Sequence, residues 1–277
     1  MPIKVSKADG TTENFDSLKL RSSLHKAGAN EEVTVHIVDE ISNSLYDGIP
    51  TEEIYRRAFA LLREHRRDTA SHYSLKRAIL EFGPSGFPFE TYLGALFKAE
   101  GYTDVKTGQI IQGACVEHEV DVIMTKDSKR FFVEAKFHNS PAIKSDLKVS
   151  LYVKARIDDL KAVLGGQNIS GMIVTNTKFT TKAIQYATCE GLELMSWGYP
   201  HGHNLHTRIE AAKLYPITAL TSLSKSQKTA LLTQKIVLCS ELKDHTDALL
   251  AAGMADKKIE QVLHEAALLC ASGKELS

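Results

Sequence analysis

Alternating polar and apolar positions predict two adjacent β-strands near the middle of the chain. Residues 118–124 and 131–137 both alternate, and a short polar stretch suited to a tight turn separates them. Because side chains of a strand alternate between its faces, Glu134 and Lys136 share one face, and Asp121 lies with the other acids of its own strand. If the two strands pair through the turn, two carboxylates and an ammonium group meet at one edge of a sheet.

The pattern on either side of this hairpin predicts an α/β domain. A long amphipathic helix is expected over residues 143–164, with one row of apolar side chains facing inward: Leu147, Leu151, Ile157, Leu160 and Leu164. The other expected elements are a helix over residues 89–102, a buried strand over 170–177, a helix over 180–190 and a strand over 192–197.

Residues 1–85 have the pattern of a separate small domain. A Gly- and Pro-rich segment, residues 83–86, is the expected boundary after it. The expected elements are strands over residues 4–10 and 11–15 joined at Asp9-Gly10, a helix capped by Asp16, a helix carrying Ile37, Val38, Ile41 and Leu45, a helix capped by Thr51, and a helix over residues 69–82.

After residue 213 the pattern predicts only short helices. Ser224 is placed to cap one of them, a second ends at Gly253, and Asp256 begins the last. Short helices around an Ala-Ala-Gly-Met turn resemble helix-hairpin-helix modules, in which turn amides hold a DNA phosphate. A helical cap or a dimerisation bundle fits the same pattern, so these interpretations stay open.

Composition limits the class of protein. A chain of 277 residues with 43% hydrophobic and 25% charged residues is long enough for two or three globular domains. No apolar run approaches the roughly 20 residues that span a bilayer, and the N-terminus lacks a secretory apolar region, so we expect a cytoplasmic protein without a membrane partner. The formal net charge is zero, so any basic surface for a nucleic acid must be local.

The four cysteines are predicted to be buried, reduced thiols. Cys115, Cys189, Cys239 and Cys270 are scattered through apolar stretches and lack CxxC spacing. That arrangement favours neither a disulfide framework nor a zinc site.

The charged hairpin carries the chemistry of metal-dependent phosphodiester hydrolysis. Carboxylate oxygens suit Mg²⁺, which polarises a phosphate and acidifies a water, and a lysine can orient that water or screen developing charge. An antiparallel hairpin with a solvated, charged face is the alternative interpretation. The elements around the hairpin favour the chemical one.

Residues 87–197 resemble the PD-(D/E)xK restriction-endonuclease-like nucleases, in particular the Mrr-like branch. The resemblance rests on the element order and on Asp121 followed by Glu134-Ala-Lys136. It implies that Asp121 and Glu134 are metal ligands and that Lys136 is the catalytic lysine, while Glu90 matches an extra acid beside the metal. Val120 replaces the proline that names the family, and Glu117 or Glu119 could assist Asp121.

The N-terminal domain resembles the ATP cone, a nucleotide-sensing domain. The matching residues are Val5 to Gly10, Phe15-Asp16, Lys19-Leu20, Ile49 to Ile54, and Tyr73 with Arg77.

This second resemblance implies a nucleotide site. Lys7 and Lys19 would meet phosphates, Glu13 and Thr51 would lie near the base or ribose, and Arg77 would close the site. Ala8 stands where the family has a basic residue. No GxxxxGK[ST] motif occurs, so ATP or dATP is expected as an effector rather than a substrate. The alternative is a set of solvated charges on a domain kept for dimerisation.

Two further groups of residues have open roles. Lys144, Lys148, Lys154 and Arg156 are expected on the outer face of the long helix, either as DNA-backbone contacts or as a solvated face, with Tyr152 and His138 near the same edge. His201, His203 and His206 could bind a transition metal, but their spacing lacks a paired motif.

The expected fold is an α/β multidomain protein. It comprises an α+β ATP cone over residues 1–85, a restriction-endonuclease-like α/β/α domain over residues 86–212, and a small helical accessory domain over residues 213–277. The expected function is an Mg²⁺-dependent, Mrr-like DNA endonuclease that responds to ATP or dATP and acts as a homo-oligomer. A nucleotide-responsive DNA-binding regulator without turnover is the alternative, and RNA cleavage is a third possibility.

Overall fold

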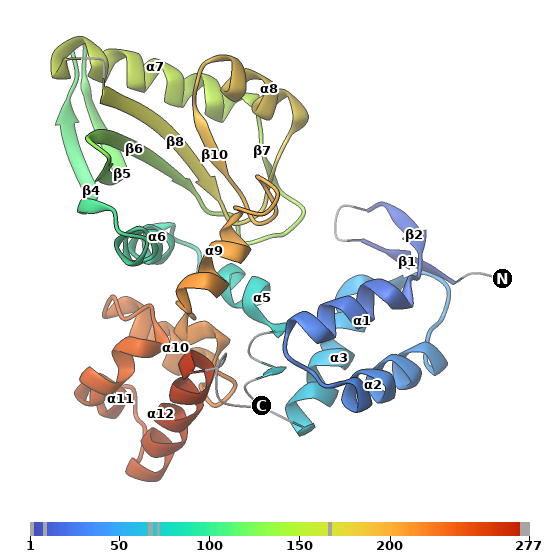
Figure 1. Ribbon diagram of the computed structural model, residues 1–277. Coiled ribbons are helices and arrows are strands. Elements are labelled where there is room, and N and C mark those ends of the chain that lie inside the picture. Colours follow the sequence, from blue (N-terminus) through green and yellow to red (C-terminus); the bar gives the residue numbers. More distant parts are fainter. Residues whose placement is uncertain (1–2, 8–9, 66–68, 71–72, 166–167, 272–277) are drawn as a thin grey trace.

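The computed structural model describes residues 3–7, 10–65, 69–70, 73–165 and 168–271. Its N-terminal part is a small three-stranded sheet covered by helices, drawn in blue in Figure 1. The sheet has the order β2-β1-β3. The elements are β1 (Lys4–Ser6), β2 (Thr12–Asn14), α1 (Ser17–Lys26), α2 (Glu31–Asn43), β3 (Ile49–Pro50) and α3 (Thr51–His65).

Two local signals of this part are confirmed, whereas Leu45 lies beyond the end of α2, and Asp9 of the predicted Asp9-Gly10 turn lies outside the described residues. β1 and β2 pair antiparallel, and the Asp16 side chain accepts hydrogen bonds from the amides of Leu18 and Lys19 at the start of α1. Helix α3 includes Thr51, the predicted cap, as its first residue. The third strand was not predicted, because two residues that pair parallel to β1 are too few to show an alternating pattern.

The helix predicted over residues 69–82 is the element of this part that differs most from the structure. The structure has α5 (Leu75–Leu80) in its second half, and residues 71–72 lie outside the described residues. Leu75, Ile79 and Phe82 belong to the hydrophobic core that contains the C-terminal helices, whereas Ala70 belongs to the core of the N-terminal domain. The end of the predicted helix therefore packs away from its own domain.

A five-stranded mixed sheet forms the central part. Its order is β10-β8-β6-β5-β4, with β4, β5 and β6 antiparallel and β6, β8 and β10 parallel. Figure 1 shows α6 below the sheet, with α7 and α8 above it. The elements are α6 (Phe87–Ala99), β4 (Thr103–Gln112), β5 (Glu117–Lys126), β6 (Lys129–Lys136), β7 (Lys144–Ser145), α7 (Leu147–Leu164), β8 (Ile169–Thr175), β9 (Lys178–Phe179), α8 (Thr181–Cys189) and β10 (Glu193–Met195).

The predicted hairpin is β5 and β6. Asp127 and Ser128 form its turn with φ values of 51° and 63°, the left-handed pair that matches the twist of antiparallel strands. Alternate residues of β6 then enter different cores, because Val133 faces the α6 side and Phe132 faces the α7 side. The alternation that predicted the strands therefore also decides which helix each side chain meets.

The inward row predicted for the long helix is wrong at two positions. Leu151 and Leu164 are exposed, whereas Val153, Ile157 and Leu160 are buried. Arg156 also faces inward. The buried face of α7 therefore follows what the sheet beneath it presents, including a charged group, rather than the row of leucines.

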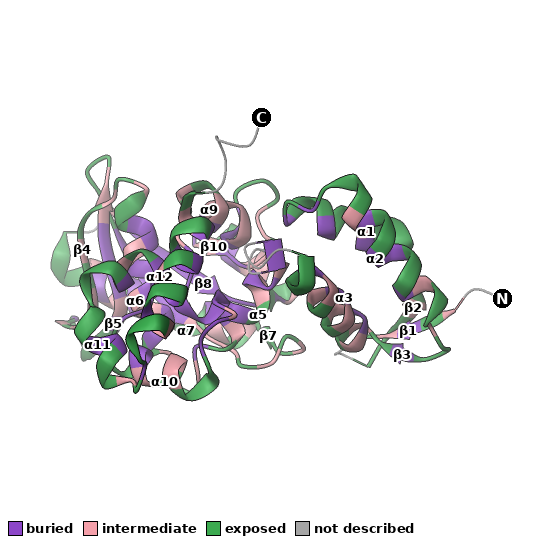
Figure 2. Cartoon of the chain, turned by 90° about the horizontal axis from the view of Figure 1, so that it is seen from below, coloured by how far each residue is buried: buried purple, intermediate pink, exposed green. Residues whose placement is uncertain are grey.

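The C-terminal helices share a core with α5 and α6. Glu265 is 3% exposed, and its carboxylate accepts hydrogen bonds from the amides of Thr221 and Ser222 and from the Thr221 hydroxyl. The elements are α9 (Leu205–Ala212), η2 (Ile217–Ala219), α10 (Lys225–Thr233), η3 (Cys239–Asp244), α11 (Thr246–Ala251) and α12 (Asp256–Ala271). In Figure 2 the residues of β8 are mostly purple, for buried, whereas α11 and α12 carry exposed residues in green.

The expected start of α10 is confirmed, because Ser224 and Gln227 form a reciprocal capping box. The expectation of buried cysteines is wrong for Cys115 and Cys189, which are exposed, and Cys239 is buried. No helix within the described residues has the length and apolar character needed to cross a membrane.

Candidate active site

The strands β5 and β6 separate at the position of the predicted site. Their paired residues run from Lys126–Lys129 at the turn to Val122–Val133. One residue further, Asp121 Oδ2 accepts a hydrogen bond of 2.6 Å from the backbone amide of Ala135. The Asp121 carboxylate thus takes the place of a backbone acceptor where the strands part, and this contact fixes it against β6.

Glu134 is the most enclosed acid of the site. It is 5% exposed, and its Oε1 lies 2.5 Å from Nζ of Lys136. Its Oε2 accepts a hydrogen bond from Nη1 of Arg156 on α7. Burial of a carboxylate is costly unless it is paired, so the two cations explain how Glu134 can occupy this position.

Arg156 is held in turn by Tyr152, one helical turn earlier. Arg156 donates a hydrogen bond to the Tyr152 hydroxyl, and its guanidinium lies 4.6 Å from the centroid of the Tyr152 ring. The side chain that fixes Glu134 is therefore itself fixed by a second contact from the same helix.

Asp121 and Glu90 complete a cluster of acids. Burial and then the charge of Glu134 raise the pKa of Asp121 to about 6, although the Ala135 hydrogen bond and the charges of Lys136 and Arg156 act in the opposite direction. Burial, followed by the charges of Asp121, Glu119 and Glu134, raises the pKa of Glu90 to about 7. The mutual repulsion of these carboxyls would be relieved by a cation.

The donor set fits a divalent cation such as Mg²⁺. One oxygen of Asp121 is taken by the Ala135 amide, which leaves the other for a cation, and Glu134 would release Lys136 to offer its Oε1. Within the described ranges, no group of three or more His, Cys, Asp or Glu side chains is arranged to hold a metal. Mg²⁺ needs only one or two carboxylates, because waters and substrate phosphate fill its remaining positions.

The segment after Lys136 is tied to the neighbouring strands. The His138 amide donates to Oδ1 of Asn176, and the Asn176 side chain donates back to the His138 carbonyl. The His138 ring lies 3.1 Å from the Ser145 hydroxyl, and burial and the charge of Lys136 lower the pKa of His138. His138 therefore joins β7 to this edge of the sheet.

The outer, basic face predicted for the long helix does not contain all four of its predicted residues. Lys154 pairs with Asp158 at 2.6 Å and with Glu190 at 3.1 Å. Arg156 is buried on Glu134 rather than exposed, and Lys144 lies on β7 rather than on the helix. Lys148 remains an exposed lysine at the start of α7.

The structure brings together three of the five predicted nucleotide-site residues. Glu13 on β2 lies 2.7 Å from Lys7 and 3.3 Å from Lys19, and the hydrogen bond with Lys7 is the main cause of its lowered pKa. Arg77 has different contacts, since it pairs with Glu81 at 3.2 Å and lies 5.9 Å from the centroid of the Tyr55 ring.

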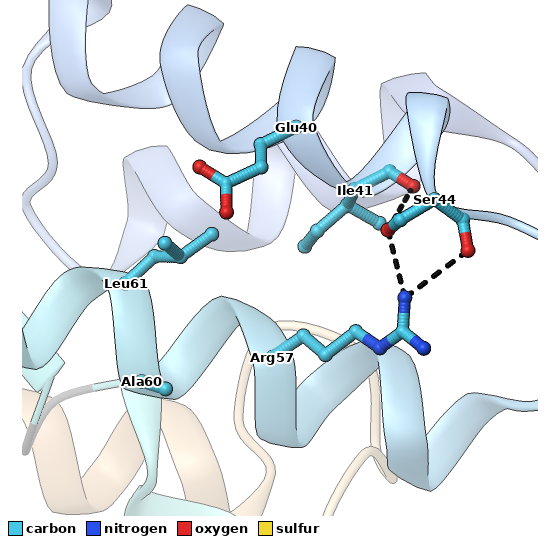
Figure 3. Close-up of a pocket in the computed structure, with 6 residues that line it drawn as sticks. All are labelled: Glu40, Ile41, Ser44, Arg57, Ala60 and Leu61. Carbon is cyan, nitrogen blue, oxygen red and sulfur yellow. Dashed lines mark hydrogen bonds between the residues drawn. The ribbon is translucent and has the colours of Figure 1, made fainter.

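A separate cavity of about 290 Å³ opens between α2 and α3 of this domain. Arg57 extends into it and donates hydrogen bonds to the carbonyl and the hydroxyl of Ser44 (Figure 3). None of the predicted nucleotide-site residues lines this cavity.

The histidines near residue 200 do not form a shared site. His206 lies 3.3 Å from Glu210, one helical turn later, and its ring packs at 5.0 Å from that of Trp197. His201 and His203 are exposed.

Comparison with known families accounts for each part of the chain. The ATP cone domain matches residues 3–81, a restriction endonuclease family matches residues 84–198, and the AF1548-like C-terminal domain matches residues 215–270. The chain is therefore a restriction-endonuclease-like protein with an N-terminal ATP cone.

An uncharacterised protein from Archaeoglobus fulgidus is 35% identical over 175 residues, which cover 63% of this chain and 97% of the relative. This chain belongs to the same family. The crystal structure of a protein of unknown function, AF1548, superposes with a TM-score of 0.57 at 32% identity, covering 68% of this chain and 100% of that one.

A repair endonuclease from Pyrococcus abyssi gives a TM-score of 0.33 at 21% identity, covering 40% of this chain and 46% of that one. The family assignment rests on the archaeal relative and the family matches.

Sequence reasoning missed the role of Arg156. Tyr152 and Arg156 are separated by one helical turn, which is a detectable spacing. The partner of Arg156 is Glu134, 22 residues earlier in another element, and no local pattern indicates that contact.

Proposed function

We propose that this protein is a metal-dependent DNA endonuclease whose activity responds to ATP or dATP. The observation that supports this most is the convergence of the Asp121 and Glu134 carboxylates with Lys136 where β5 and β6 part. The restriction-endonuclease family match over the same residues supports the same reaction class.

Each residue of the cluster has a distinct task in this proposal. Asp121, held by the Ala135 amide, and Glu134, held by Arg156, would bind the metal through oxygens that already have fixed positions. Bound Mg²⁺ would supply a polarised phosphate and a water acidified for attack. Lys136, released from Glu134, would orient that water or stabilise charge that develops on the phosphate.

Glu90 has a role that depends on pH. Its carboxyl group lies in the field of Asp121, Glu119 and Glu134, and its pKa of about 7 keeps a proton within reach of neutral conditions. We propose that it assists the two metal ligands rather than acting as an obligatory one.

The ATP cone supplies the proposed regulation. Lys7 and Lys19 flank Glu13, so a nucleotide that binds there with its phosphates on the lysines would break two ion pairs and reorganise β2 and the start of α1. Nucleotide binding would shift an equilibrium between oligomeric states, and differential affinity for those states would change the cutting rate. Since one active site hydrolyses one strand at a time, cutting of both strands in a single encounter would imply at least a dimer.

The first experiment is cleavage of supercoiled plasmid with Mg²⁺ by the wild type and by Lys136→Ala, each without nucleotide, with ATP and with dATP. The proposal expects nicked or linear product from the wild type, a nucleotide-dependent change in rate, and loss of product in Lys136→Ala. Wild-type protein that binds DNA and never cuts it would instead support a nucleotide-responsive regulator. Cleavage confined to an RNA substrate would replace the DNA assignment.

A further inference from the structure

Both oxygens of the Glu134 carboxylate are already engaged in the folded protein. Oε1 lies 2.5 Å from Nζ of Lys136, and Oε2 accepts a hydrogen bond from Nη1 of Arg156. One oxygen of Asp121 is also engaged, since Oδ2 accepts a hydrogen bond of 2.6 Å from the Ala135 amide. The way in which a cation enters this site therefore depends on which of these donors can leave.

Lys136 can leave Glu134 at little cost. Its side chain is 37% exposed, so water can replace the carboxylate as a partner of the ammonium group. A lysine also presents a compact charge on a flexible chain, which turns easily toward another anion. Oε1 of Glu134 is therefore the oxygen that becomes open to a cation.

Arg156, in contrast, is held in its position. Its side chain is 8% exposed, and Tyr152 contacts the guanidinium both with its hydroxyl and with its ring, whose centroid lies 4.6 Å away. The Nε atom of Arg156 is buried and makes no hydrogen bond within the described structure. Departure of the guanidinium from Glu134 would leave a buried charge without its partner, which is strongly unfavourable. Oε2 of Glu134 therefore keeps its arginine.

An arginine at this oxygen limits the number of cations that the carboxylate can hold. Two catalytic metal ions lie about 3.5–4 Å apart, so a carboxylate shared between them offers one oxygen to each. The guanidinium contacts Oε2 of Glu134 and repels any divalent cation that approaches this oxygen. The Ala135 amide that contacts Asp121 is uncharged and exerts no such repulsion. Arg156 is therefore the group that decides how many cations Glu134 can hold.

We propose that Arg156 is a positioning residue that limits the site to one divalent cation by keeping Oε2 of Glu134. This inference rests on the proposed function, because it states the metal content of the same site. It also gives Tyr152 a task, since the tyrosine holds the guanidinium on the carboxylate. With one cation bound, the second positive group available to a substrate phosphate is Lys136 rather than another metal ion.

The test counts the Mn²⁺ ions bound to full-length protein without nucleic acid. Mn²⁺ prefers the same oxygen ligands as Mg²⁺, and its paramagnetic resonance signal in solution weakens as ions bind, which gives the number of ions per chain. Ions that belong to the site are those lost when Glu134→Gln is added to each protein.

The wild type should bind one such ion. Arg156→Met should bind two, because Oε2 of Glu134 is then open and no guanidinium repels the second ion. Arg156→Lys should bind one, since it keeps a positive charge beside the same oxygen. Arg156→Gln can still donate a hydrogen bond to Oε2 without carrying a charge, so it should also bind two, and it replaces Arg156→Met if that variant does not fold.

Arg208→Met is the matched control. It removes a partly buried guanidinium that donates a hydrogen bond of 2.6 Å to Glu100 elsewhere in the same domain, and it should leave the count at one. Urea unfolding confirms that each variant is folded before its ions are counted.

Two ions in the wild type would overturn the inference, and so would a single ion in folded variants that lack the charge of Arg156. Both results would leave the proposed nuclease intact, because metal would still be bound. A wild type that binds no Mn²⁺ would overturn the inference together with the metal site of the proposed function, so the two failures are distinguishable.

Discussion

The substitution Asp121→Asn tests whether the site is arranged for a cation. It removes a carboxylate charge that should destabilise the metal-free protein, although the same charge is proposed to be needed for activity. The pKa of Asp121 is raised from its ordinary value of 3.8 to about 6, chiefly by burial and by the charge of Glu134. Below pH 3.8 the carboxyl group is mainly protonated in both the folded and the unfolded protein, so its raised pKa has little effect on the free energy of unfolding there. The cost of ionising this carboxyl in the folded protein grows between pH 3.8 and about 6, so the folded protein is destabilised by the ionised Asp121 above about pH 6.

The size of this cost follows from the shift. About two pKa units correspond to ~3 kcal/mol at 1.36 kcal/mol per unit. Because Asp121 is partly exposed to solvent, screening reduces the expected value to about 1–2 kcal/mol. Asparagine can keep the hydrogen bond from the Ala135 amide through its carbonyl oxygen, so little structure should be lost.

The assay is urea-induced unfolding in EDTA at pH 8 and at pH 4, followed by the same measurement with Mg²⁺. Asp121→Asn should be more stable than the wild type at pH 8, with the difference shrinking toward zero at pH 4. Added Mg²⁺ should stabilise the wild type and leave the variant unchanged. The exposed substitution Asp39→Asn is the control and should stay within about 0.5 kcal/mol. A variant that is less stable at pH 8 without metal would refute the reasoning, because the Asp121 carboxylate would then be stabilised by its surroundings.

Three further outcomes are expected. Arg156→Met should lower the free energy of unfolding in urea by about 3 kcal/mol, because it leaves the buried Glu134 carboxylate with a single cation. Adding Glu134→Gln to the same chain should recover most of that loss, and the absence of recovery would contradict the pairing. Glu265→Gln should cost about 1–3 kcal/mol, since one amide oxygen cannot accept all three hydrogen bonds, and an unchanged urea midpoint would disprove it. Lys7→Gln should weaken ATP binding about tenfold, as measured by calorimetry. Arg77 contacts Tyr55 and Glu81 instead, so Arg77→Gln should change ATP affinity by no more than about twofold, and equal losses in the two variants would place both residues at one site.

Local sequence patterns determined much of the architecture and the positions of the proposed catalytic residues. The hairpin was predictable because alternation and turn residues act within a few positions, and the structure places its tight turn at Asp127 and Ser128. The start of α1 at Asp16 and the start of α10 at Ser224 were predictable for the same reason, since a cap involves neighbouring residues only. The resemblance to the two families added the order of the domains.

Tertiary structure alone decided which partners these residues have. Arg156 lies on the inward face of α7 because the buried carboxylate of Glu134 needs a partner, and this need overrides the row of leucines that suggested a different inward face. Leu75 and Ile79 join the core of the C-terminal helices rather than the core of the ATP cone, since a helix can bury its apolar face against whichever surface lies beside it. The period of a helix shows that one face is apolar, but the choice of the surface that covers that face depends on contacts between residues far apart in the chain.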